Sequence, residues 1–177
     1  MHADRAAEVV AAAAEFAERA DEPERLAWIE HGRGAVAQEH GDLATARRHL
    51  EESARLFAEL GLYAPMAGRH TFLCELEVAA GDLDAAERHA RIAIDGYARA
   101  GDHDGVAGSY HSTGELALRR GDVGAALAEF ARGLSVDGVA DRFTVAHLLA
   151  GVAAASAMRR RSREASAVSM SGFSRTV

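Results

Sequence analysis

Apolar residues recur at steps of three and four along most of the chain, which is the spacing of one face of an α-helix. The clearest stripe comprises Leu43, Ala46, Leu50, Ala54 and Phe57. Alanine and arginine are strong helix formers and β-branched residues are sparse, so local propensity agrees with this spacing. The pattern predicts an all-α fold, with helices over residues 3–20, 24–40, 43–60, 64–80, 83–100, 104–120, 123–136 and 141–158.

A Gly-Asp dipeptide returns every 40 residues, at Gly41-Asp42, Gly81-Asp82 and Gly121-Asp122. Glycine can close a helix in the left-handed conformation, and aspartate after it can cap the next helix. Similarity at a fixed period is typical of stacked helical repeats. We therefore expect one repeat domain over residues 1–158, followed by a basic, frayed or disordered tail over 159–177. The domain would contain a remnant helix at 3–20, repeats at 24–60, 64–100 and 104–136, and a partial repeat at 141–158.

The spacing within each unit resembles the tetratricopeptide repeat (TPR) family. Its pattern has a glycine in the first helix, a Gly-Asp-like turn and then a small residue. Gly34, Gly41 and Ala46 match it, Gly114, Gly121 and Ala126 match it again, and the middle unit has Cys74 at the first glycine position. The resemblance implies a right-handed superhelical solenoid of antiparallel helix pairs, with a 40-residue period. HEAT and armadillo arrays share this period but lack the turn pattern.

Two longer segments, HGDLATARRHLEESARLFAELG and TGELALRRGDVGAALAEFARGL, look like the C-terminal TPR sensor arrays of bacterial regulators. Those regulators are LuxR-type and related signal-transduction ATPases. This sequence has no lysine, so it contains no G-x-x-x-x-G-K-[ST] nucleotide-binding loop. The resemblance thus implies a sensor or interaction array, with a free-standing or self-associating adaptor as the alternative.

In tetratricopeptide folds, the first helix of each pair lines a concave groove. By this resemblance, the partner-binding positions are Trp28, His31, Gln38, Glu39, Thr71, Glu75, His111, Glu115 and Arg119. In the second repeat, Gly68 and Val78 lie on the same face as Thr71 and Glu75. This mixed, acidic set would suit a partner helix or a basic segment, with Trp28 as an aromatic anchor. The alternative is that these positions are simply exposed, or that Trp28 packs against the preceding helix. The alanine-rich first helix offers a second docking edge for self-association.

Charge and composition narrow the choice of partners. The formal net charge is −7, although residues 142–177 hold six arginines and one acidic residue. An acidic body makes nucleic acid an unexpected partner. No apolar stretch is long enough to span a membrane, and Cys74 is the only cysteine, so we expect a cytoplasmic protein without a disulfide.

The sequence gives no reason to expect catalysis, a cofactor or a metal. His49 and His89 occupy one repeat position, and His31 and His111 another. Residues one repeat apart are too distant to share an ion that needs ligands at about 2 Å. We expect Cys74 to be a small core residue. A small helical metal-dependent enzyme is the remote alternative.

Overall fold

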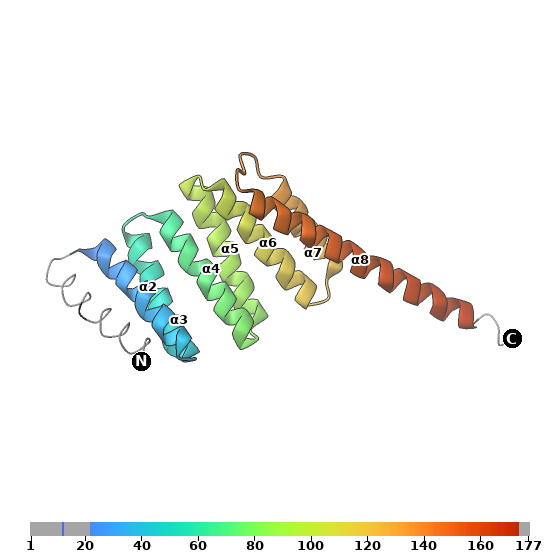
Figure 1. The fold of residues 1–177 in the computed structure, drawn as a ribbon, viewed down its shortest axis with the longest axis horizontal. Helices are drawn as coiled ribbons and strands as arrows, with labels where there is room; N and C mark the ends of the chain where they lie inside the picture. Colours follow the sequence, from blue (N-terminus) through green and yellow to red (C-terminus); the bar gives the residue numbers. More distant parts are fainter. Residues whose placement is uncertain (1–11, 13–21, 174–177) are drawn as a thin grey trace. The chain divides into compact units, whose positions relative to one another are not determined.

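The computed structural model describes residue 12 and residues 22–173, with side chains up to residue 164. This part of the chain is all-α and forms seven helices (Figure 1). They are α2 (Pro23–Glu39), α3 (Leu43–Glu59), α4 (Tyr63–Ala80), α5 (Leu83–Ala100), α6 (His103–Arg119), α7 (Val123–Leu134) and α8 (Arg142–Phe173). The expected helix at 3–20, and with it the proposed docking edge, lies outside the described residues.

The Gly-Asp joints have the predicted geometry. Gly81 is left-handed, with φ of 85°, and closes α4. The Asp82 side chain accepts a hydrogen bond from the Ala85 backbone N–H at 2.9 Å, which caps α5. Asp42 and Asp122 cap α3 and α7 in the same way. These joints place the helix ends of α2 to α7 within two residues of the predicted positions.

The last helix differs from the prediction. We expected it to end near residue 158 and a frayed or disordered tail to follow, but α8 continues to Phe173. The segment after Met158 is rich in arginine, alanine and serine and contains no proline. Arginine and alanine have high helix propensity, so the backbone stays helical although the apolar stripe fades.

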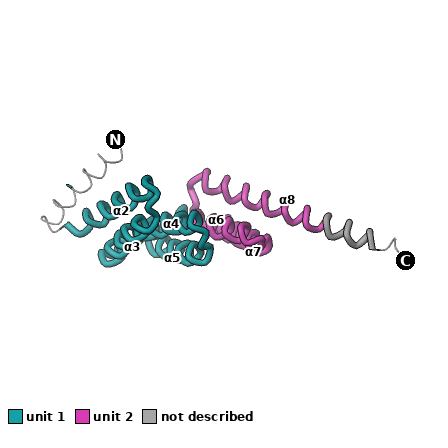
Figure 2. The backbone as a smooth tube through the Cα atoms, turned by 90° about the horizontal axis from the view of Figure 1, so that it is seen from below, with its two compact units in different colours: residues 1–106 teal, residues 107–177 magenta. Residues whose placement is uncertain are grey.

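The chain divides into two compact units, residues 1–106 and 107–177 (Figure 2). In the first, α2 packs on α3, α3 on α4, and α4 on α5. In the second, α7 packs on α8. Two groups of buried apolar residues form the core of the first unit: Ala27, Ala54, Phe57, Met66, Ala67 and Ala93, and Ala37, Ala46, Leu50, Leu73 and Leu76. The fold is therefore helical and repeat-like.

The small residues that follow each Gly-Asp turn are buried. Ala46, Ala86 and Ala126 are fully buried. Cys74 is also buried, and burial raises the pKa of its thiol to about 11. A thiol with so high a pKa holds almost no thiolate at neutral pH. Cys74 is therefore a core residue.

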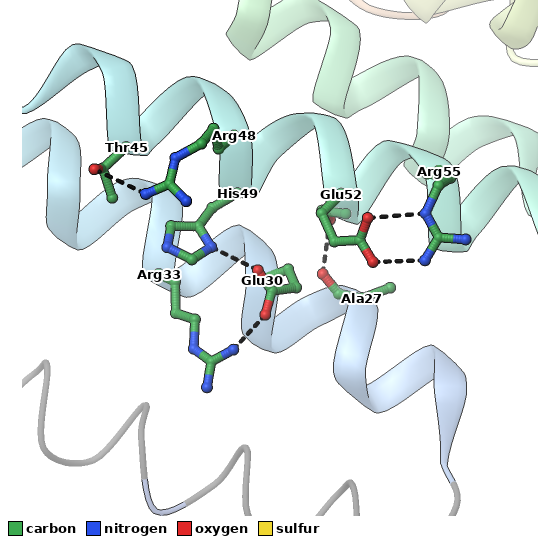
Figure 3. Close-up of polar contacts among 9 residues, drawn as sticks. Ala27, Glu30, Arg33, Thr45, Arg48, His49, Glu52 and Arg55 are labelled. Atoms are coloured by element: carbon green, nitrogen blue, oxygen red, sulfur yellow. Dashed lines mark hydrogen bonds and ion pairs between the residues drawn. The ribbon is translucent and has the colours of Figure 1, made fainter.

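Polar contacts fix α2 against α3 (Figure 3). The buried Ser53 hydroxyl donates to the Ala27 carbonyl oxygen at 2.6 Å. One turn along α2, the Glu30 carboxylate accepts from Arg33, and its Oε2 lies 2.6 Å from His49 Nδ1. Because the Ser53–Ala27 and His49–Glu30 contacts join the two helices, they set the position of the α2 side chains near Trp28.

Candidate binding site

Two half-exposed aromatic side chains, Trp28 and Phe72, and the partly buried His31 lie together on α2 and α4, the two neighbouring first helices of unit 1. Trp28 and His31 stand one turn apart on α2, with ring centroids 6.3 Å apart and nearly perpendicular. The His31 ring is 5.0 Å from that of Phe72 on α4. Trp28 is 46% exposed and Phe72 39% exposed. Aromatic surface of this kind is common at the centre of protein interfaces.

A buried arginine lies beneath these rings. Arg69, on α4, is only 6% exposed. Its guanidinium carbon lies 4.9 Å from the centroid of the Trp28 ring, 5.5 Å from that of Phe72 and 5.6 Å from that of Phe57 on α3. These are cation–π distances. We call Trp28, His31, Phe57, Arg69 and Phe72 the Arg69 cluster.

Several polar atoms of the Arg69 cluster have no partner. Nε and Nη1 of Arg69 and Nδ1 of His31 are buried without a hydrogen bond. Burial lowers the pKa of Arg69, and the Tyr97 phenol acts in the opposite direction. Burial and the neighbouring Arg69 lower the pKa of His31. His31 is therefore mainly neutral at pH 7, and the positive charge of the cluster resides on Arg69.

The other predicted positions of unit 1 lie apart from this cluster, are exposed, or form a hydrogen bond within their own helix. Gln38 and Glu39 are exposed in the last turn of α2, about 15 Å from Trp28 along the helix axis. The Thr71 hydroxyl donates to the Ala67 carbonyl oxygen of its own helix at 3.3 Å. Glu75 is exposed, although partial desolvation raises its pKa.

The predicted positions of unit 2 form a separate arrangement. His111 Nε2 lies 4.0 Å from Glu115 Oε1, one turn along α6. The His111 ring is 5.7 Å from that of Phe130 and 5.6 Å from that of His147. Burial lowers the pKa of His111. Arg119 is exposed at the end of α6. This group contains no unpaired buried cation in the described part of the unit.

The sequence interpretation missed Arg69 and Phe72. The repeat register assigned Gly68, Thr71, Glu75 and Val78 to the binding face of α4, which left these two residues unassigned. A signal was present, because Arg69 directly follows the small or apolar residues 66–68 and is itself followed closely by Phe72. However, burial beneath residues of α2 and α3 is a contact between helices and has no local signature in the sequence.

A histidine pair between α4 and α5 was also not anticipated. His70 Nδ1 lies 3.0 Å from His89 Nδ1, and their rings are stacked with centroids 5.3 Å apart. Burial, and then the neighbouring His89, lower the pKa of His70 to about 4. Within the described residues, no three histidine, cysteine, aspartate or glutamate side chains are grouped as a metal site would require.

An open hollow of about 590 Å³ borders the exposed side of Trp28. It is lined by Glu22, Pro23, Glu24, Arg25, Trp28 and Leu60. Trp28 thus belongs both to the Arg69 cluster and to the lining of a concave surface that could receive further parts of a ligand. In the described part of the chain, no helix is both long enough and apolar enough to cross a membrane.

Comparison with known proteins shows the fold alone. No family model matches the sequence, and no curated protein matches it. Among solved structures, the chain is similar to BtubC (BKLC) from P. vanneervenii, with a TM-score of 0.67 and 20% sequence identity. The match covers 82% of this chain and 61% of BtubC, so this chain spans less than two thirds of that protein. BtubC is helical and repeat-like, which agrees with the architecture described above.

Proposed function

We propose that this protein is a non-catalytic scaffold that binds a protein or peptide, built as a superhelical tetratricopeptide array. The surface formed by the half-exposed Trp28 and Phe72 rings, with the partly buried His31 between them, supports this proposal most directly. It joins two neighbouring first helices, as a groove that receives an extended or helical segment would. Aromatic side chains supply much contact area at low entropic cost, so they are frequent binding hot spots.

A finer proposal is that the array is the sensor part of a bacterial regulator. Its support is the resemblance of the two Gly-Asp segments to LuxR-type sensor arrays. A free-standing adaptor would use the same surface, so peptide binding is common to both forms of the proposal.

The test is selection of ligands from a library of random 12-residue peptides displayed on phage, with the complete 177-residue chain as bait. We expect selected peptides to bind the unaltered chain and to lose at least about tenfold in affinity when Trp28→Ala and Phe72→Ala are combined. Fluorescence anisotropy of labelled peptides would measure this loss.

The matched control is Ile92→Ala, because Ile92 is a 41% exposed apolar residue of the same unit on α5. It should leave the affinity of the selected peptides unchanged. If the library yields no binders, or if the binders are equally weakened by Ile92→Ala, the proposed peptide-binding surface is wrong.

A further inference from the structure

Arg69 carries a buried positive charge without a counter-ion. An arginine stays protonated at physiological pH even in a desolvated site. In the described part of the chain, no carboxylate forms an ion pair with it, and no hydrogen bond engages its guanidinium. Burial of an unpaired charge is energetically costly, so buried charges are normally paired.

The aromatic rings compensate this charge only in part. A cation–π contact attracts a cation to the face of an aromatic ring, and the rings of Trp28, Phe57 and Phe72 lie within that range of the Arg69 guanidinium carbon. The N–H bonds, by contrast, lie in the plane of the group and require acceptors at its edge. Nε and Nη1 have no acceptor. The Arg69 guanidinium therefore has aromatic neighbours at cation–π distance but lacks a hydrogen-bond acceptor.

The edge of the guanidinium can be reached from solvent. Nη2 is the one nitrogen of Arg69 that is not buried, and it has no hydrogen bond. Trp28 and Phe72, which lie over the group, are themselves half exposed. An incoming acceptor would meet Nη2 first, and pairing its second oxygen with Nε–H or Nη1–H requires the side chains that cover these two buried atoms to move.

We propose that the Arg69 cluster binds a carboxylate of the partner peptide, as a two-oxygen pair with the edge of the Arg69 guanidinium between the Trp28 and Phe72 rings. The planar fork of arginine matches a carboxylate in this geometry. A single positive charge neutralises a monoanion, whereas a phosphate dianion would bring a second negative charge that no other residue of the Arg69 cluster can pair, and burying an unpaired charge is costly. This inference rests on the proposed function. It implies that the partner peptide has an acidic residue where it contacts Arg69, in place of the basic segment expected from the sequence.

The first test uses sodium acetate as the probe and needs no selected peptide. In an NMR titration at pH 7 and constant ionic strength, the Arg69 Nε–H and the Trp28 indole N–H signals should shift and saturate with acetate. The chain has only one tryptophan, so its indole signal is unambiguous. Inorganic phosphate should bind more weakly than acetate. No saturable shift with acetate, or tighter binding of phosphate, would overturn the carboxylate assignment.

The second test uses Arg69→Met, which keeps an unbranched chain of similar length without the charge. Replacing an unpaired buried charge by an apolar side chain is often neutral or stabilising. We therefore expect the melting temperature of Arg69→Met to equal or exceed that of the unaltered chain, together with at least a tenfold loss of affinity for acidic peptides. A strong fall in melting temperature would show that Arg69 has a structural role instead. Arg69→Lys, which keeps the charge without the planar fork, should fold and should also lose affinity.

Selected peptides separate failure of this inference from failure of the proposed function. Replacing the acidic residue of a selected peptide, by Glu→Gln or Asp→Asn, should weaken its binding at least tenfold to the unaltered chain and little to Arg69→Met. If peptides bind but neither change affects them, the peptide-binding function stands and the carboxylate site is wrong. If no peptide binds but acetate saturates the two signals, the carboxylate site stands and the proposed function fails.

Discussion

At the scale of single residues, small and large side chains compensate between the two helices of a repeat. A Cβ at Gly34 would lie 3.1 Å from Cγ of Leu50, and one at Gly114 would lie 2.3 Å from Cε1 of Phe130. A side chain at position 34 would thus fit tightly against Leu50. Position 114 accepts only glycine unless the Phe130 ring moves. The equivalent residues of the middle repeat are Cys74 and Ala90, both buried. There the first helix has the larger side chain and the second helix the smaller one.

Gly114→Ala tests this compensation. The added methyl group would overlap the Phe130 ring, so we expect a loss of about 1–3 kcal/mol in the free energy of unfolding. Chemical denaturation followed by circular dichroism would measure it. The matched control is Gly108→Ala on the same helix, where a Cβ has open space and should stabilise the helix by about 0.5–1 kcal/mol. Equal effects of the two substitutions would contradict the proposed fit of Phe130 against Gly114.

At the scale of helices, the sequence predicts a helix end correctly where a glycine or a capping aspartate marks it. The turns of Gly41, Gly81 and Gly121 are left-handed, and the aspartate after each caps the next helix, so both ends are specified locally. The end of α8 carries no such marker. Its extent depends on propensity alone, which is why the expected end at residue 158 was wrong.

The residues of the candidate site also divide into those that the sequence pattern predicts and those that it does not. Trp28 and His31 could be predicted because they lie on the face that the repeat register assigns to the groove. Arg69 could not, because its burial results from rings on α2 and α3 as well as on its own helix. A repeat register gives the direction in which a side chain points from its own repeat. How deeply that side chain is buried depends on the residues of the neighbouring repeat.

Ala86→Arg tests the packing of helices. Ala86 is fully buried on α5, so an arginine there would need to displace a neighbouring helix or bury an unpaired charge. We expect a loss of about 3 kcal/mol or more in the free energy of unfolding, seen as a large fall in melting temperature. Ala98→Arg, at an exposed position of the same helix, should change it little. A melting temperature unaffected by Ala86→Arg would refute the assignment of this helix face.

At the scale of the whole molecule, partly buried histidines make stability depend on pH. Burial lowers the pKa values of His31, His70, His89 and His111 in the folded protein. As the pH falls below about 6.5, the unfolded chain takes up protons on these residues that the folded protein does not. Folding stability from these groups is therefore present above that pH and declines as the pH falls toward 4.

His70 should contribute clearly to this decline, because its pKa is lowered to about 4. We expect His70→Gln to flatten the decrease in unfolding free energy between about pH 7 and pH 5, measured by urea titration at several pH values. His103→Gln, at an exposed histidine, is the control and should keep the slope of the unaltered chain. An unchanged slope in His70→Gln would mean that the His70–His89 contact does not exclude the proton.

The identical Gly-Asp joints also bear on how such a chain could change in length over evolution. An in-frame deletion of residues 42–81 would join Gly41 directly to Asp82, and a duplication of the same segment would join Gly81 to Asp42. Either event recreates the dipeptide that closes one helix and caps the next, so recombination between repeats leaves every turn chemically complete. The number of repeats is therefore a property that a single genetic exchange can alter without new local structure.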